Sequence, residues 1–206
     1  MTTDRMSMLT TTAAIAISVV ALVLTAAMKA NAPVLAYVHF LVAAATAAVC
    51  VAIAVYDMNR LRTEKASPSA LAASTASHLG LVWIWGAIAL IVTYGTQVLT
   101  WKEWMPFFLA FFLAAGLCMF FSATLKKDAA EGKVDGSMLN IARTLTLVQL
   151  VSMGVVVVGL LLDGKMTRFM TPRFTDWAAN NIFFTGAIAV AAICAYALKV
   201  IPKARA

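Results

Sequence analysis

The chain has 206 residues, of which 63% are hydrophobic and 12% are charged, and its mean hydropathy is +0.90. This composition excludes a soluble globular protein and leaves no room for a separate soluble domain. The formal net charge of +7 does not require a nucleic-acid partner, because basic residues gather at the inner face of membrane proteins, next to anionic lipids. We therefore expect one transmembrane domain over residues 1–206, in contact with the lipid bilayer.

Six apolar stretches are each about 22 residues long, or ~33 Å at helical rise, which matches the thickness of a hydrocarbon core. Runs such as 13–27 and 107–121 are apolar on every face, as in helices, whereas the strands of a membrane barrel alternate. The sequence therefore predicts an all-α bundle of six transmembrane helices. The expected spans are 9–30, 34–56, 78–100, 104–125, 139–162 and 177–200.

The orientation follows from the basic residues, which are concentrated in the cytoplasmic segments of membrane proteins. Eleven of the sixteen lysines and arginines fall on the side of the predicted spans that also holds both chain ends. They are Arg5, Arg60, Arg62, Lys65, Lys126, Lys127, Lys133, Arg143, Lys199, Lys203 and Arg205. The sequence therefore predicts a multi-pass protein with both termini in the cytoplasm, and we expect the inner (cytoplasmic) membrane of a bacterium.

The first span has two interpretations. Arg5, the apolar stretch 9–30 and the small residues Ala30 and Ala32 are typical of a cleaved signal peptide. Against cleavage, the apolar stretch is long for a signal, and Pro33 would directly follow the cut. We favour a retained anchor and keep removal of residues 1–32 as the alternative.

The second span carries His39, a few residues inside its outer end. Ionisable side chains at membrane depth are functional candidates, because they are costly to bury there. His39 could ligate a haem or a copper ion, with a methionine or a cysteine opposite. A haem held between His39 and His78 is excluded, because these residues lie near opposite membrane faces, ~20 Å apart at helical rise. The simpler interpretation is that His39 bonds a nearby carbonyl.

Other polar residues are expected near His39 on the outer side. Tyr94 and Gln97 close the third span, and Asn180 and Asn181 open the sixth. Together these side chains would form an outward-facing pocket for a small solute. In the alternative interpretation, the polar residues at the start of the sixth span only cap that helix.

Two charged cytoplasmic segments follow the second and fourth spans. We expect the first over 57–77 and the second over 126–137. The two halves of the chain share this layout, and residues 48–50 correspond to 116–118, as in a parallel internal repeat. Unrelated helical hairpins would give the same layout, so duplication is one of two interpretations.

Four polar residues are expected together on the inner side, at the start of spans three and five: His78, Asn140, Arg143 and Gln149. The simplest role for Arg143 is to extend to the lipid headgroups. Gln149 lies deeper, and we expect it to make an interhelical hydrogen bond.

Three cysteines, Cys50, Cys118 and Cys194, lie in three different spans. Converging thiols would bind a soft metal ion. The simpler interpretation is that each is a small buried side chain in an alanine-rich helix.

The fourth span differs from the others in its aromatic content, because six phenylalanines surround it. They are Phe107, Phe108, Phe111, Phe112, Phe120 and Phe121. Such a helix either faces lipid broadly or packs against a partner protein or a cofactor.

A distinctive order of side chains runs through residues 34–162: a histidine, a basic cytoplasmic segment, a tryptophan before a later helix, and an arginine near the start of the next. The residues are His39, Arg60, Arg62, Trp104 and Arg143. In this order the chain resembles the four-helix membrane modules of the copper-resistance-D and HemJ-type protoporphyrinogen-oxidase group. The resemblance implies a haem- or copper-associated helical bundle with His39 as ligand. A further histidine of that group is replaced around 118–121, so the resemblance does not extend to enzymatic activity.

The sequence lacks HExxH, CxxC and GxSxG motifs and a phosphate-binding glycine loop, and so supports no common hydrolase, redox-motif or nucleotide site. We therefore expect a non-enzymatic, integral accessory subunit of a larger membrane complex, with a redox or electron-transfer role and other membrane subunits as partners. The alternatives are a small haem- or metal-binding protein that uses His39, and a small-molecule channel or permease.

Overall fold

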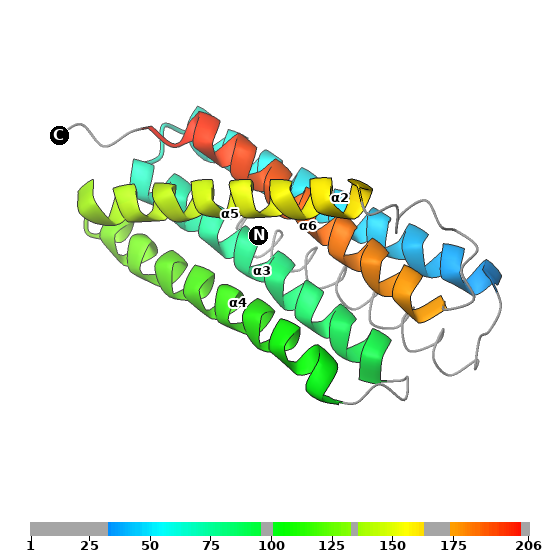
Figure 1. Cartoon of the computed structure of the whole chain (residues 1–206). Coiled ribbons are helices and arrows are strands. Elements are labelled where there is room, and N and C mark those ends of the chain that lie inside the picture. Colours follow the sequence, from blue (N-terminus) through cyan, green and yellow to red (C-terminus); the bar gives the residue numbers. More distant parts are fainter. Residues whose placement is uncertain (1–32, 96–100, 133–135, 163–173, 203–206) are drawn as a thin grey trace.

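The described part of the chain consists of five α-helices, as a computed structural model shows for residues 33–95, 101–132, 136–162 and 174–202 (Figure 1). The helices are α2 (Pro33–Thr63), α3 (Pro68–Gly95), α4 (Trp101–Ala130), α5 (Gly136–Leu162) and α6 (Phe174–Val200). The prediction of an all-α protein is confirmed. The predicted first span, 9–30, lies outside the described residues.

Four helices contain stretches that are long and apolar enough to cross a membrane: Ala44–Thr63, Pro68–Ile88, Phe108–Ala130 and Gly136–Gly159. The described apolar stretch of α6, Phe184–Val200, is shorter. These stretches indicate a multi-pass membrane protein in contact with the lipid bilayer. The described residues do not establish six spans.

The α3 helix lies at the centre of the bundle. It contacts each of the other four described helices, and 72% of its membrane stretch is buried, against 33% for α2, 22% for α4 and 11% for α5. In Figure 1, α3 lies between α4 on one side and the neighbouring pair α2 and α6 on the other, with α5 crossing the bundle. The neighbours of α3 therefore determine its surroundings almost completely, whereas α5 is largely exposed.

The α3 and α4 helices approach each other closely at two glycines. A methyl group added at Gly80 would lie 3.2 Å from Cε of Met119, and one added at Gly86 would lie 2.6 Å from Cε1 of Phe111. The Phe111 ring meets Trp83 edge to face, with the ring centroids 5.0 Å apart. Since small residues let helix backbones come together in lipid, these two glycines set the spacing of α3 and α4.

Contrary to the prediction from the sequence, residues 57–77 do not form one connecting segment between two spans. They are helical except for residues 64–67, so α2 ends later and α3 begins earlier than the predicted spans. Lys65 adopts φ 54°, and the amide of Ala66 donates to the carbonyl of Leu61 at 2.9 Å, which closes the end of α2. Ser67 then accepts a hydrogen bond from the amide of Ala70 at 3.2 Å and caps the start of α3. The charged and hydroxylated residues of 57–77 therefore lie on two packed helices.

The aromatic α4 helix combines the two environments that the sequence left open. Phe111 is half-buried against Trp83, whereas Phe112 and Phe120 are exposed on the other side of the helix. One face of α4 packs on α3, and the opposite face is available to lipid or to a partner.

Replacing Gly86 with alanine tests the close approach of α3 and α4. The added methyl group cannot fit unless the Phe111 ring moves away from Trp83, and such overpacking costs about 1–3 kcal/mol. We expect Gly86→Ala to lower the stability of the detergent-solubilised protein by this amount in thermal unfolding.

The matched control is Gly116→Ala on α4, because no atom lies within 4 Å of a methyl group added there. This variant should unfold at the parent temperature or slightly above it, since alanine favours helix over glycine by up to about 1 kcal/mol. Equal losses in the two variants would contradict the close packing of α3 and α4.

Candidate functional site

A stripe of buried residues along α2 leads to the candidate site. Ala47, Cys50, Ala54 and Asp57 recur at intervals of three or four residues, Met58 lies four residues after Ala54, and all five are buried. This spacing places them on one face of the helix, which packs against α3 and α6. The last turns of that face therefore carry a carboxylate into the protein.

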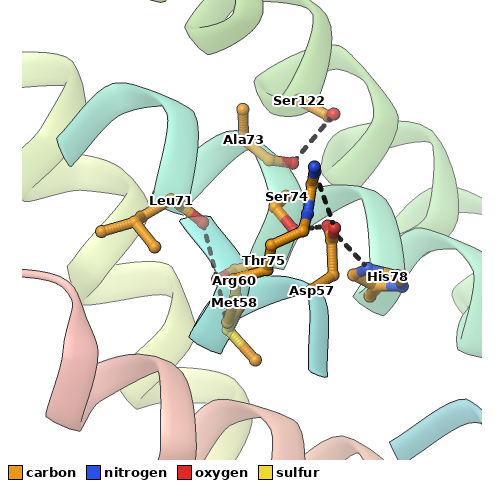
Figure 2. Close-up of polar contacts among 9 residues, drawn as sticks. All are labelled: Asp57, Met58, Arg60, Leu71, Ala73, Ser74, Thr75, His78 and Ser122. Atoms are coloured by element: carbon orange, nitrogen blue, oxygen red, sulfur yellow. Dashed lines mark hydrogen bonds and ion pairs between the residues drawn. The ribbon is translucent and has the colours of Figure 1, made fainter. Parts of the chain in front are cut away.

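Asp57 is held by three side chains (Figure 2). Its Oδ2 atom accepts a hydrogen bond from Ser74 Oγ at 2.7 Å and lies 3.4 Å from Nε2 of His78. Ser74 and His78 are four residues apart, so they project from the same face of α3. The side chains of Asp57 and His78 are only 9% and 7% exposed, which makes this a buried acid–histidine pair.

Arg60 forms ion pairs with the other carboxylate oxygen of Asp57 and with a second acidic residue. Its guanidinium lies 3.4 Å from Oδ1 of Asp57 and 3.5 Å from Oε1 of Glu64, one helical turn further on. The side chain of Arg60 is 24% exposed, whereas that of Glu64 is 54% exposed. Arg60 therefore connects the buried carboxylate to the surface of the bundle.

Two neutral hydrogen bonds surround the acid–histidine pair (Figure 2). Thr75 Oγ1 lies 3.0 Å from the carbonyl of Leu71 on its own helix and 3.2 Å from Sδ of Met58, so its hydroxyl also contacts α2. Ser122 Oγ donates to the carbonyl of Ala73 at 3.0 Å, which joins α4 to α3. These bonds fix the position of α3 relative to the helices on either side of the pair.

The other two helices are joined to the bundle at the same end. The hydroxyl of Tyr196 on α6 donates to the side-chain oxygen of Asn59 on α2. Arg143 on α5 donates to the carbonyl of Ile201, directly after α6. All five described helices are therefore connected by hydrogen bonds where α2, α4 and α6 end and α3 and α5 begin.

A cavity of about 430 Å³ lies beside the acid–histidine pair, among α2, α3 and α4. Its polar lining consists of Asp57, Ser74, Ser77, His78 and Lys126, and the remaining walls are apolar. This volume is of the order of pockets that hold small ligands. The cavity combines one carboxylate, one ammonium group, one imidazole and two hydroxyl groups, so it can bind a small polar solute.

A second cavity, of about 140 Å³, lies among α3, α4, α5 and α6 and has almost wholly apolar walls. Its two most polar residues already have partners within the protein. Gln149 Oε1 accepts from Nε1 of Trp83 at 3.0 Å, and Thr146 Oγ1 donates to the carbonyl of Ala142 at 2.8 Å. This cavity therefore favours a small apolar occupant over a polar solute.

The residues expected together on the inner side have separate partners. His78 belongs to the Asp57 pair, and Arg143 is half-buried and donates to the carbonyl of Ile201, directly after α6. The interhelical hydrogen bond expected for Gln149 is confirmed by its bond to Trp83. Asn140 is exposed on α5.

The outer candidate pocket lies outside the part of the chain whose side chains are described. His39, Tyr94, Asn180 and Asn181 fall within α2, α3 and α6, but the described side chains do not include theirs, and Gln97 falls between α3 and α4. Binding of a haem or a copper ion by His39 therefore stays a prediction.

The three cysteines are free and buried. Within the described residues, no three histidine, cysteine, aspartate or glutamate side chains come together as a set of metal ligands. Cys50, Cys118 and Cys194 therefore do not converge on one soft-metal site.

The burial of Asp57 was not expected, although the sequence contains a signal for it. Asp57 continues the apolar series Ala47, Cys50 and Ala54 at helical spacing, and Ser74 and His78 are one helical turn apart. Both patterns continue into 57–77, which the predicted spans left out of the membrane helices.

Comparison of the chain with protein-family models, with characterised proteins and with solved structures finds no match. The resemblance to the copper-resistance-D and HemJ-type group therefore stays a prediction, and the function has to be argued from the site itself.

Replacing Asp57 with alanine tests whether the pair supports the fold. The change would leave Ser74, His78 and Arg60 without their shared acceptor, and unpaired buried polar groups cost about 1–3 kcal/mol. We expect Asp57→Ala to lower the stability by this amount in thermal unfolding of the solubilised protein.

The matched control is Glu64→Ala, which removes the exposed partner of the same arginine. Exposed ion pairs contribute about 0–1 kcal/mol, so this variant should stay near the parent stability. A loss as large as that of Asp57→Ala would argue against a special role for the buried carboxylate.

Proposed function

We propose that this chain is a membrane permease or channel for a small polar solute, with the cavity beside Asp57 and His78 as its cytoplasmic binding site. The observation that carries this proposal is a buried, ionisable pair that lines a cavity at the end of membrane-crossing helices. Ionisable residues at such positions are costly, and they commonly mark the paths of solutes and ions.

Helix packing alone does not account for the charges in the cavity. Neutral bonds from Thr75 and Ser122 already join α3 to α2 and α4. Ser77 and Lys126 line the same cavity. A donor, an ammonium group and a carboxylate facing one cavity favour a solute that carries both hydrogen-bonding and charged groups.

The cytoplasmic orientation is supported by the basic residues of the described helices. Seven of them lie at the end of the bundle that holds the cavity: Arg60, Arg62, Lys65, Lys126, Lys127, Arg143 and Lys199. Lys102 lies at the opposite end, at the start of α4. Under the positive-inside rule, the cavity would lie at the cytoplasmic face of the inner membrane and open toward the cytoplasm.

The first test is access to the cavity from the cytoplasmic side. In inside-out vesicles, Ser77→Cys should react with a charged, membrane-impermeant thiol reagent, because Ser77 lines the cavity. The parent chain is the control, since Cys50, Cys118 and Cys194 are buried and should react little. A Ser77→Cys thiol that reacts no faster than the parent would argue against an open cytoplasmic cavity.

The second test is solute flux in proteoliposomes, with labelled zwitterionic amino acids, small carboxylates and small amines as probes. We expect uptake of at least one class above that of empty liposomes. Uptake should fall roughly tenfold or more in Asp57→Asn and His78→Ala, because hydrogen bonds to charged groups contribute about 1.5–3 kcal/mol. Asn140→Ala, exposed on α5, should not change it. An uptake rate that is the same in Asp57→Asn, His78→Ala and the parent would contradict the proposal.

A second candidate function is the accessory subunit of a larger membrane complex, and the exposed face of α5 favours it. Exposed side chains recur along this helix at intervals of three and four residues, which is the spacing of a helix-packing seam. They are Ile141, Thr144, Val148, Val151, Val155, Val158 and Leu162. A redox or electron-transfer complex, and the alternative of a haem or copper ligand at His39, remain proposals based on the sequence.

Gentle extraction from native membranes tests this second candidate. If α5 docks a partner subunit, that partner should co-purify at fixed stoichiometry and should be lost with Val155→Trp. The control Leu113→Trp, on the exposed face of α4, should keep it. A chain that arrives alone would remove the subunit role, and an optical spectrum of the same sample, repeated on His39→Ala, tests for haem.

A further inference from the structure

The α2 helix has an exposed face made largely of small residues. Leu41, Ala45, Ala48, Ala52 and Tyr56 are all exposed and follow one another at intervals of three or four residues. Alanines at the centre of such a face let a second helix backbone approach closely in lipid. Small residues alone do not identify a contact, so the surroundings of α2 decide what covers this face.

The other faces of α2 are occupied. Its buried stripe packs against α3 and α6, and among the described helices neither α4 nor α5 contacts it. The alanine face of α2 is therefore open to a further helix of the bundle.

The chain itself contains a candidate for this position. The apolar stretch 9–30 ends two residues before α2 begins at Pro33. Two or three linking residues reach ~7–11 Å, which is about one helix-to-helix distance. At helical rise the stretch is ~33 Å long and so covers the exposed part of α2.

The stretch 9–30 also matches this face in composition. Ala14, Ser18, Ala21 and Thr25 recur at intervals of four, three and four residues, the same kind of spacing as the exposed alanines of α2. In an antiparallel pair with so short a turn, Ala45 would lie opposite the region of Ser18 and Ala21.

We propose that residues 9–30 of this chain pack as an antiparallel helix on the exposed face of α2 formed by Leu41, Ala45, Ala48, Ala52 and Tyr56. The inference requires a retained first span rather than a cleaved signal peptide. It does not depend on the solute site proposed above.

Disulfide cross-linking in membranes tests this proposal. Ala45→Cys is combined in turn with Ser18→Cys and with Ala21→Cys, and mild oxidation should link one of these pairs within a single chain. Trypsin cleaves after Lys29 in the denatured protein, so mass spectrometry separates linked from unlinked peptides. The control Ala47→Cys, on the buried face of α2, should form no link with either partner.

Three outcomes would overturn the proposal: a link between two chains, no link with either partner, or a mature protein whose mass lacks residues 9–30. A second measurement guards against variants that fold poorly. Ala48→Leu should lower the thermal unfolding midpoint by crowding a helix contact, whereas Ala110→Leu, exposed on α4, should not. An unchanged midpoint in Ala48→Leu would mean that lipid covers this face.

Discussion

The arrangement of the helices depends on how the polar groups in the first half of α3 are paired within the protein. A buried hydroxyl or carboxylate group is costly unless another group pairs with it, and most of those in this half of α3 are paired within the protein. Among the described residues of α3, the buried hydroxyl of Ser69 is an exception, since it has no hydrogen-bond partner. Ser74 and Thr75 bond side chains of α2, and the carbonyl of Ala73 accepts from Ser122 on α4. The neutral bonds of this set contribute only about 0.6 kcal/mol each on average in a membrane protein, whereas the bond of Ser74 is to an aspartate carboxylate and is charge-assisted. The set acts chiefly by fixing the rotation and the depth of α3.

Steric contacts position the other half of α3. Beyond His78 the helix presents Gly80 and Gly86 to α4, where any larger side chain would meet Met119 or Phe111. Hydrogen bonds thus set the register at one end, and close approach sets the spacing further along. The α5 helix has few such constraints: it packs mainly on α6 and meets α3 through the bond of Gln149 to Trp83. This difference explains why α3 is buried and α5 is exposed.

The sequence predicts the helical class and the apolar lengths of these helices, because both depend on local composition. It also predicts the bond of Gln149, since an isolated amide at membrane depth has few other ways to be satisfied. Local polarity does not predict that Asp57 is buried, because it cannot distinguish a charged loop from a charged helix end that faces a histidine one helix away; only the helical spacing from Ala54 indicates it. The sequence does not predict the packing of α4 either, for a related reason. Its phenylalanines surround the helix, so no periodicity indicates that Phe111 packs inward and Phe112 outward.

The α2 helix links the two proposals, because it carries the cavity residues on one face and the exposed alanines on the other. Because α2 and α4 share no contact, the side of α3 that carries Ser77 and His78 is left open as a cavity. The small-residue face of α2 lies on the opposite side of that helix from Asp57 and has no neighbour among the described helices. A helix formed by 9–30 on that face would therefore contact α2 away from Asp57 and Leu61, which line the cavity. In that arrangement, substitutions on the alanine face would change solute binding without contacting the solute, because they would shift the α2 segment that carries Asp57. Substitutions on the exposed face of α5 would not, since α2 and α5 share no contact.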